Sequence, residues 1–230
     1  MKDSVVSKKS ALFVAAVANF LTPFMGSSVA VALPSIGQEF RADAISLSWV
    51  STIYTLAAAM FLVPMGRIGD IYGRRRVFLG GVATYSLSTV LAAMARSTEM
   101  LIACRALEGL GGAMVFGTSV AIVTSVFPPQ ERGQALGINV AAVYVGLSLG
   151  PFLGGLLTQY LGWRSIFLAT MPLAVLIEIL ALWRLRGEWA DCRGEKVDIA
   201  GSALYGLALV GIMYGFSRLP AASGVYLVAA

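Results

Sequence analysis

The residues most able to do chemistry are one basic and one acidic side chain inside a long apolar run. Arg105 and Glu108 are the only charged residues between positions 100 and 127. A charge inside a membrane-spanning helix costs about 2.5–3.5 kcal/mol on insertion scales, so we expect it to face a cavity and to find a partner. The spacing of three residues puts both side chains on one face of a helix.

Glu108 is therefore a candidate proton carrier. Burial of its carboxyl group favours the protonated form, whereas the charge of Arg105 favours the ionised form. Two alternatives remain open from the residues alone. One is a permanent ion pair between the two side chains, and the other is an arginine that extends to the outer membrane surface.

A second charged set lies in residues 66–76, between two apolar runs. The glycines permit a tight turn, and Asp70 can accept hydrogen bonds from arginine side chains or cap a helix. Three consecutive arginines, Arg74, Arg75 and Arg76, also suit an anchor that orients the chain in a membrane. The residue types do not decide between these interpretations.

Other residues favour helix packing or a cavity. Gly146, Gly150 and Gly154 recur every four residues, with Gly155 and Pro151 beside them. Small residues at this spacing let two helices approach closely, and Pro151 favours a kink. The residues that are candidates to line a substrate cavity are Asn19, Tyr54 and Tyr144. The asparagine equally suits helix packing, and the tyrosines equally suit an interfacial aromatic belt.

Composition limits the classes of protein that these residues can belong to. Of the 230 residues, 58% are hydrophobic and only 13% are charged, with a mean hydropathy of +0.81. Soluble domains carry about 25% charge, so a soluble enzyme or binding module is excluded. The absence of histidine removes histidine bases and the usual zinc sites. The two cysteines, Cys104 and Cys192, make neither a disulfide framework nor a metal site.

Long uncharged runs position these residues on membrane-spanning helices. The predicted spans are residues 10–33, 44–65, 77–95, 100–127, 134–157, 165–183 and 199–216, and a further apolar run begins at 224–230. The net charge of +5 comes from lysines and arginines in the loops, mostly on the side of the N-terminus. By the positive-inside rule this side is cytoplasmic, and the pattern favours a membrane rather than nucleic acid as the partner.

Residues 66–76 resemble the signature loop of the major facilitator superfamily. In that family the aspartate and the basic residues form a cytoplasmic latch that stabilises one alternating-access state. The resemblance implies this role for Gly66, Arg67, Asp70, Gly73, Arg74 and Arg75. Arg132, in the next turn on the same side, is a candidate partner for Asp70.

Three more segments resemble helix motifs of this family. Residues 105–112 are similar to the fourth-helix motif, whose arginine is linked to proton transfer, with Glu108 in place of the usual glutamine. Residues 146–155 are similar to the fifth-helix motif of proton-driven antiporters, which favours export. Residues 25–34 resemble the first-helix motif of drug–proton antiporters, but Met25 occupies the acidic position, so we assign proton coupling to Arg105 and Glu108.

The resemblance implies an all-α membrane protein: the six-helix N-terminal half of a major facilitator transporter plus a seventh span. Residues 1–183 would form the half, residues 184–198 a cytoplasmic linker, and residues 199–230 the seventh span and the start of a truncated eighth. The start of the seventh span resembles the central helices of 14-helix antiporters. The implied location is the cell membrane, with a cytoplasmic N-terminus.

The implied function is proton-coupled efflux of small amphipathic or cationic compounds by alternating access, in a chain that is inactive without its C-terminal half. The expected partners are the lipid bilayer, a small-molecule substrate, protons and that half, with no cofactor, metal or nucleic acid. The alternative is a non-transporting membrane scaffold or sensor that keeps the fold. The absence of histidine and of a buried nucleophile–base pair argues against an enzyme.

Overall fold

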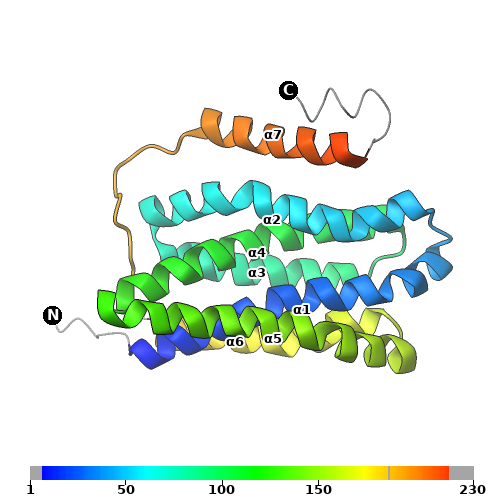
Figure 1. Cartoon of the computed structure of the whole chain (residues 1–230), viewed down its shortest axis with the longest axis horizontal. Helices are drawn as coiled ribbons and strands as arrows, with labels where there is room; N and C mark the ends of the chain where they lie inside the picture. Colours follow the sequence, from blue (N-terminus) through cyan, green and yellow to red (C-terminus); the bar gives the residue numbers. More distant parts are fainter. Residues whose placement is uncertain (1–6, 186, 218–230) are drawn as a thin grey trace.

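The computed structural model of the chain describes residues 7–185 and 187–217, and every regular element in these ranges is a helix (Figure 1). The elements in chain order are α1 (Lys8–Phe40), α2 (Ala44–Tyr72), α3 (Arg74–Ala93), α4 (Thr98–Val126), α5 (Pro129–Leu161), α6 (Arg164–Arg184) and α7 (Ile199–Ser217). The first six are long and apolar enough to cross a membrane, and α7 contains the shorter apolar helix Ile199–Gly215. The predicted all-α membrane fold is therefore confirmed. The apolar run at 224–230 lies outside the described residues.

Several helices extend beyond the predicted spans. The first helix continues to Phe40 and the second to Tyr72, and the fifth begins at Pro129. The apolar run marks only the part of a helix that contacts lipid. Backbone hydrogen bonds within a helix need no lipid, so a helix can continue into the polar region. Pro129 suits a first helical position because its missing N–H has no helical partner to lose.

The connection between α2 and α3 is consequently a single residue. Gly73 has φ 118° and ψ 122°, a backbone conformation that residues with a side chain rarely adopt. Its N–H donates to the carbonyl of Gly69 at 2.9 Å and so closes the last turn of α2. The turn predicted across residues 67–76 is therefore mostly helix, and its arginines begin α3 directly.

The six long helices pack as two related groups. The first helix packs most extensively against α5, and α4 packs against α2 and α3, whereas α6 lies against α3 and α1. Exchanging α1–α3 with α4–α6 leaves this set of contacts nearly unchanged, as expected for a repeat of three helices. Within the described residues α7 contacts α2 alone, and Figure 1 shows it lying along α2 outside the other six helices.

The two ends of this bundle carry different charges. At one end of the bundle α2 and α6 finish, and α3 and α5 begin. We call this end the arginine end. At the opposite end, Glu39 of α1 binds α6, because its carboxylate accepts from the Trp163 indole at 2.7 Å and pairs with Arg164 at 2.7 Å. There also Asp43 caps α2, and hydrogen bonding by Ser46 lowers the pKa of the Asp43 carboxyl.

Candidate functional site

The centre of the site is a fully buried ion pair on α4. Arg105 Nη1 lies 2.5 Å from Glu108 Oε2, and neither side chain exposes any surface. The pair confirms that the two residues share one helix face. Its burial rules out an arginine that extends to the membrane surface. The expected open cavity beside the pair is also wrong for this conformation, since the neighbouring helices close over both side chains.

Two groups of α2 hold the arginine in place. The carbonyl oxygen of Val50 accepts a hydrogen bond from Arg105 Nε at 3.3 Å. The Arg105 guanidinium carbon lies 4.3 Å from the centre of the Tyr54 ring. A cation over an aromatic face is stabilised by up to about 2 kcal/mol when water is excluded. The Tyr54 hydroxyl in turn donates to the carbonyl of Thr22 in α1 at 3.4 Å, so this tyrosine links three helices.

The carboxylate is held from the other side by α3. Thr89 Oγ1 lies 2.8 Å from Glu108 Oε1, in a wholly buried contact. The Tyr85 ring is also buried here, one turn earlier on α3. Arg105 Nη2 and Tyr85 Oη have no hydrogen-bond partner among the described residues. The pair thus lies where α2, α3 and α4 meet, with unused hydrogen-bonding groups on Arg105 and on Tyr85.

The candidate cavity residues occupy different places. Asn19 is 1% exposed and accepts a hydrogen bond from Ser119 Oγ of α4 at 3.0 Å, so it joins α1 to α4. Tyr54 faces Arg105, as described above. Tyr144 is 63% exposed on α5. Met25, at the position where the resemblance expects an acid, is completely buried in the core of the bundle.

The predicted latch residues gather at the arginine end. Asp70 Oδ1 lies 2.7 Å from Arg74 Nη2 across the Gly73 turn, and Arg74 Nη1 donates to Ser125 Oγ of α4 at 2.5 Å. The aspartate therefore joins α2 to α3, and the arginine joins α3 to α4. Arg132 is exposed and donates to the carbonyl of Phe127 at 3.0 Å, so in this conformation it is not the partner of Asp70.

The segment after α6 folds back over this latch, and we call residues 187–195 the strap. Its backbone bonds to the latch twice: the N–H of Arg74 donates to the carbonyl of Trp189 at 2.8 Å, and the N–H of Cys192 donates to the carbonyl of Asp70 at 3.0 Å. Its three acidic residues form ion pairs with arginines of α2 and α3, namely Arg67 with Glu195, Arg74 with Asp191 and Arg76 with Glu188. The N–H of Arg75 donates to Glu188 Oε1 at 2.9 Å.

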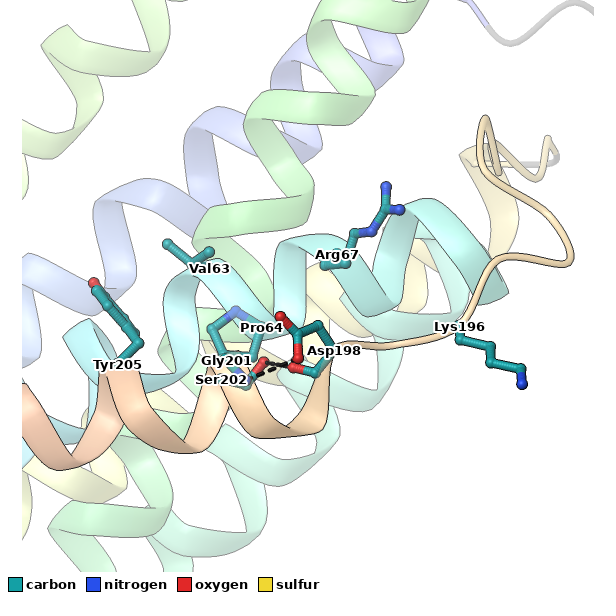
Figure 2. A pocket seen from close by; sticks show the side chains of 8 residues that line it. All are labelled: Val63, Pro64, Arg67, Lys196, Asp198, Gly201, Ser202 and Tyr205. Atoms are coloured by element: carbon teal, nitrogen blue, oxygen red, sulfur yellow. Dashed lines mark hydrogen bonds between the residues drawn. The ribbon is translucent and has the colours of Figure 1, made fainter.

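Among the pockets at this end of the molecule, two lie beside the latch arginines. One, of about 410 Å³, lies between Arg74, Arg132 and the strap residue Asp191. The other, of about 360 Å³, lies between α2 and α7 and is shown in Figure 2. In that view Lys196 points away from the pocket, and Asp198 is bound to the first turn of α7, accepting from the Gly201 N–H at 2.8 Å. Neither pocket reaches the buried ion pair.

The glycines of α5 lie directly against α1. An added Cβ at Gly150 would come within 2.7 Å of the carbonyl oxygen of Phe24, and one at Gly154 would meet Ser28 at the same distance. Gly146 faces the carbonyl of Phe20 in the same way. The Ser28 hydroxyl donates to the carbonyl of Gly150 at 3.0 Å. Gly155 is half-buried beside α1, whereas Pro151 is exposed.

Comparison with known proteins identifies the family. Residues 15–191 match the model of the Major Facilitator Superfamily, which covers more than half of the chain. The chain belongs to this superfamily. A structure solved as "peptide transporter POT in complex with sulfate" superposes with a TM-score of 0.73 at 16% identity, over 94% of this chain and 49% of that chain. At that identity the likeness shows the fold alone.

Curated relatives of this chain include proteins that are named for drug resistance or for export. The multidrug resistance protein Stp of Mycobacterium tuberculosis is 37% identical over 84% of this chain and 36% of its own length. The cephamycin export protein CmcT of Amycolatopsis lactamdurans is 37% identical over 91% of this chain and 43% of its own length. The tetracenomycin C resistance and export protein of Streptomyces glaucescens is 29% identical over 91% of this chain and 39% of its own length. The chain thus spans less than half the length of these relatives.

Two parts of the site in this chain were not predicted from its sequence. Thr89 was not singled out, although the short connection between α3 and α4 places that residue at about the depth of Arg105. The loop after α6 was treated as a linker. Three acidic residues in that loop, Glu188, Asp191 and Glu195, complement the arginines of 67–76 in charge. That complementarity was a usable signal for the strap.

Proposed function

We propose that these helices form one half of a proton-coupled exporter of small amphipathic or cationic compounds. The observation that carries the proposal is the Arg105–Glu108 pair, fully buried where α4 meets its neighbours. A buried carboxylate beside a single arginine is retained at a stability cost, which suits a group that must change charge. The names of the relatives, which include multidrug resistance and antibiotic export, support export rather than uptake.

The chemistry of the pair is proton binding and release without covalent intermediates. Ionised Glu108 is held by Arg105 and by Thr89. When Glu108 is protonated, Nη1 of Arg105 no longer faces a negative charge. Arg105 keeps its contacts with Val50 and Tyr54 of α2. The contact between α4 and α3 through Glu108 and Thr89 therefore depends on the proton. Since the pair has no exposed surface here, proton exchange requires the helices around it to separate in another conformation.

The latch completes the proposed cycle at the arginine end. Asp70, Arg74 and the strap tie α2, α3 and α4 together in this conformation. The basic residues Arg67 and Arg75 bind the same strap, and the glycines Gly66 and Gly73 give the connection its shape. We propose that a second six-helix half, in the 14-helix arrangement, faces this one and binds substrate between the halves. Arg132 is the latch residue with the most freedom to bind that half.

The driving force is sufficient for concentrative export. A proton moving down 100 mV releases about 2.3 kcal/mol, and one pH unit adds about 1.4 kcal/mol. Together they sustain a substrate gradient of a few hundredfold for one proton per cycle. The orientation that we propose has a cytoplasmic arginine end, in the cell membrane, so that an inward proton gradient drives substrate outward.

The test is transport by everted membrane vesicles from cells that express these helices joined to a second six-helix half, with cationic dyes as substrates and an imposed pH gradient. Glu108→Gln should abolish uptake driven by the gradient but retain exchange of labelled for unlabelled dye, because exchange needs no net proton movement. Glu178→Gln is the matched control, since it removes another carboxylate from an apolar helix, α6, and should leave gradient-driven uptake intact.

Two results would overturn the proposal. If Glu108→Gln keeps its full response to the pH gradient, Glu108 does not carry the coupled proton. If the unmodified protein binds dyes but neither exchanges nor accumulates them, it is a membrane scaffold or sensor instead. Met25, which occupies the position of the usual acidic residue, favours that alternative.

A further inference from the structure

The hydroxyl of Thr89 touches two acceptors at once, although it has a single proton to donate. Its Oγ1 lies 2.8 Å from Glu108 Oε1 and 2.8 Å from the carbonyl oxygen of Tyr85, one turn earlier in α3. A threonine hydroxyl has one O–H donor and two acceptor lone pairs. At any moment it therefore donates to one of these oxygens, and toward the other it can act only as an acceptor.

The other carboxylate oxygen is occupied by a donor that cannot change. Glu108 Oε2 faces Arg105 Nη1 at 2.5 Å, and an arginine side chain only donates. A proton on Oε2 would point at that N–H. A proton that arrives at Glu108 is therefore directed to Oε1, where the neighbouring atom is the Thr89 oxygen.

We propose that Thr89 is a positioning residue for proton binding by Glu108, which selects Oε1 and satisfies both protonation states. When Glu108 is ionised, the Thr89 hydroxyl donates to Oε1. When Oε1 carries the proton, the carboxylic acid donates to Thr89 Oγ1 and the hydroxyl proton turns to the carbonyl of Tyr85. The one covalent change is the O–H bond that forms at Oε1 with the incoming proton, and all other changes are in hydrogen bonds.

This arrangement links the charge of α4 to α3. When Thr89 changes from donor to acceptor toward Glu108, its contact with the carbonyl of Tyr85, one turn earlier in α3, changes as well. The other groups that titrate or carry charge and face Glu108 within the described residues are Arg105 and Cys104 of α4, Tyr54 of α2 and Tyr85 of α3. Among these groups and Thr89, only Arg105 and Thr89 make a hydrogen bond to the carboxyl group.

The inference rests on the proposed function, because it assumes that Glu108 binds the coupled proton, and it is tested by infrared difference spectroscopy. The purified chain is reconstituted in lipid nanodiscs and titrated with acid while the carbonyl stretch of protonated carboxyl groups is recorded. Glu108→Gln identifies the Glu108 band as the one that disappears. Glu178→Gln provides the control for a second carboxyl group in an apolar helix, and it should leave that band in place.

Thr89→Val should shift the Glu108 band to higher wavenumber, because the acid loses its acceptor. The titration midpoint of the band should move to higher pH by about one unit, because a hydrogen bond to the charged form is stronger than one to the neutral form. Thr89→Ser, which keeps the hydroxyl, should restore both values. If Thr89→Val does not fold, Thr89→Ala serves for the same comparison, with circular dichroism as the check.

The outcomes separate the two proposals. A Glu108 band that is unchanged in Thr89→Val or Thr89→Ala, or that shifts equally in Thr89→Ser, overturns the role of Thr89 and leaves proton binding by Glu108 standing. The absence of any band that depends on Glu108 across the titration overturns both, since no proton then reaches that carboxyl group.

Discussion

At the residue scale, burial of the Arg105–Glu108 pair on α4 has a cost in folding free energy. Arg105 and Glu108 lose all contact with water, and their mutual attraction together with the contacts to Val50, Tyr54 and Thr89 only partly offsets the loss of hydration. Within residues 7–185 and 187–217, Arg105 Nη2 has no hydrogen-bond partner. Apolar residues of similar size often pack as well as a buried ion pair, which agrees with the role in proton coupling that we propose for these two residues.

Replacing one member of this pair is predicted to be more harmful than replacing both. Arg105→Met leaves Glu108 buried without its partner and should lower the free energy of unfolding by about 3–5 kcal/mol, whereas Arg105→Met with Glu108→Met should recover most of that loss. Denaturant unfolding in detergent micelles measures both. Lys8→Met, which breaks the exposed pair with Glu131, should cost less than about 1 kcal/mol and is the control. Additive losses in the double variant would contradict the coupling.

At the element scale, the contact between α1 and α5 depends on the absence of side chains. The two helices approach so closely along Gly146, Gly150 and Gly154 that backbone carbonyls of α1 lie where Cβ atoms would be. Close approach increases van der Waals contact, which is a main attraction between helices in lipid.

A pair of glycine replacements tests this contact. Gly150→Ala should lower the free energy of unfolding by about 1–3 kcal/mol, because its Cβ would overlap the carbonyl of Phe24. Gly137→Ala, on the same helix, meets nothing within 4 Å and should be neutral or stabilising by up to about 1 kcal/mol. Thermal unfolding in detergent compares them. Equal stability of the two variants would show that α5 does not need the glycine at position 150.

At the scale of the whole molecule, charge is separated between the two ends. The arginine end carries the latch and the strap, which together join α2, α3 and α4 through four arginines, acidic groups of α2 and of the loop after α6, and Ser125 of α4. The opposite end is joined by Glu39, Trp163 and Arg164. Such an excess of basic residues on one side predicts the orientation of the bundle in a membrane.

Labelling of single cysteines tests this orientation. In a chain that lacks its native thiols (Cys104→Ala and Cys192→Ser), Arg193→Cys in the strap should react with a membrane-impermeant maleimide only in everted vesicles. Gln38→Cys, exposed near the end of α1, should react from outside intact spheroplasts. The reverse pattern would place the N-terminus outside and would reject a cytoplasmic latch.

Much of the fold was predictable from the sequence because hydropathy and charge are local properties. Runs such as residues 100–127 identified the helices, and the charged motif at 66–76 predicted which helix ends share a side of the membrane. The pairing of Arg105 with Glu108 also followed from spacing alone, since three residues separate neighbours on a helix surface. The helix ends were less predictable, because a helix continues past the lipid boundary that hydropathy detects.

The tertiary structure alone decided which distant residues meet. That Thr89 faces Glu108, that Tyr54 covers Arg105, and that the strap rather than Arg132 binds the latch are contacts between separate helices or between a loop and a helix end. Their geometry depends on how helices rotate and cross when their side chains pack, and on the path that a polar loop takes. Periodicity along one chain segment carries neither kind of information, because both arise only when the segments assemble.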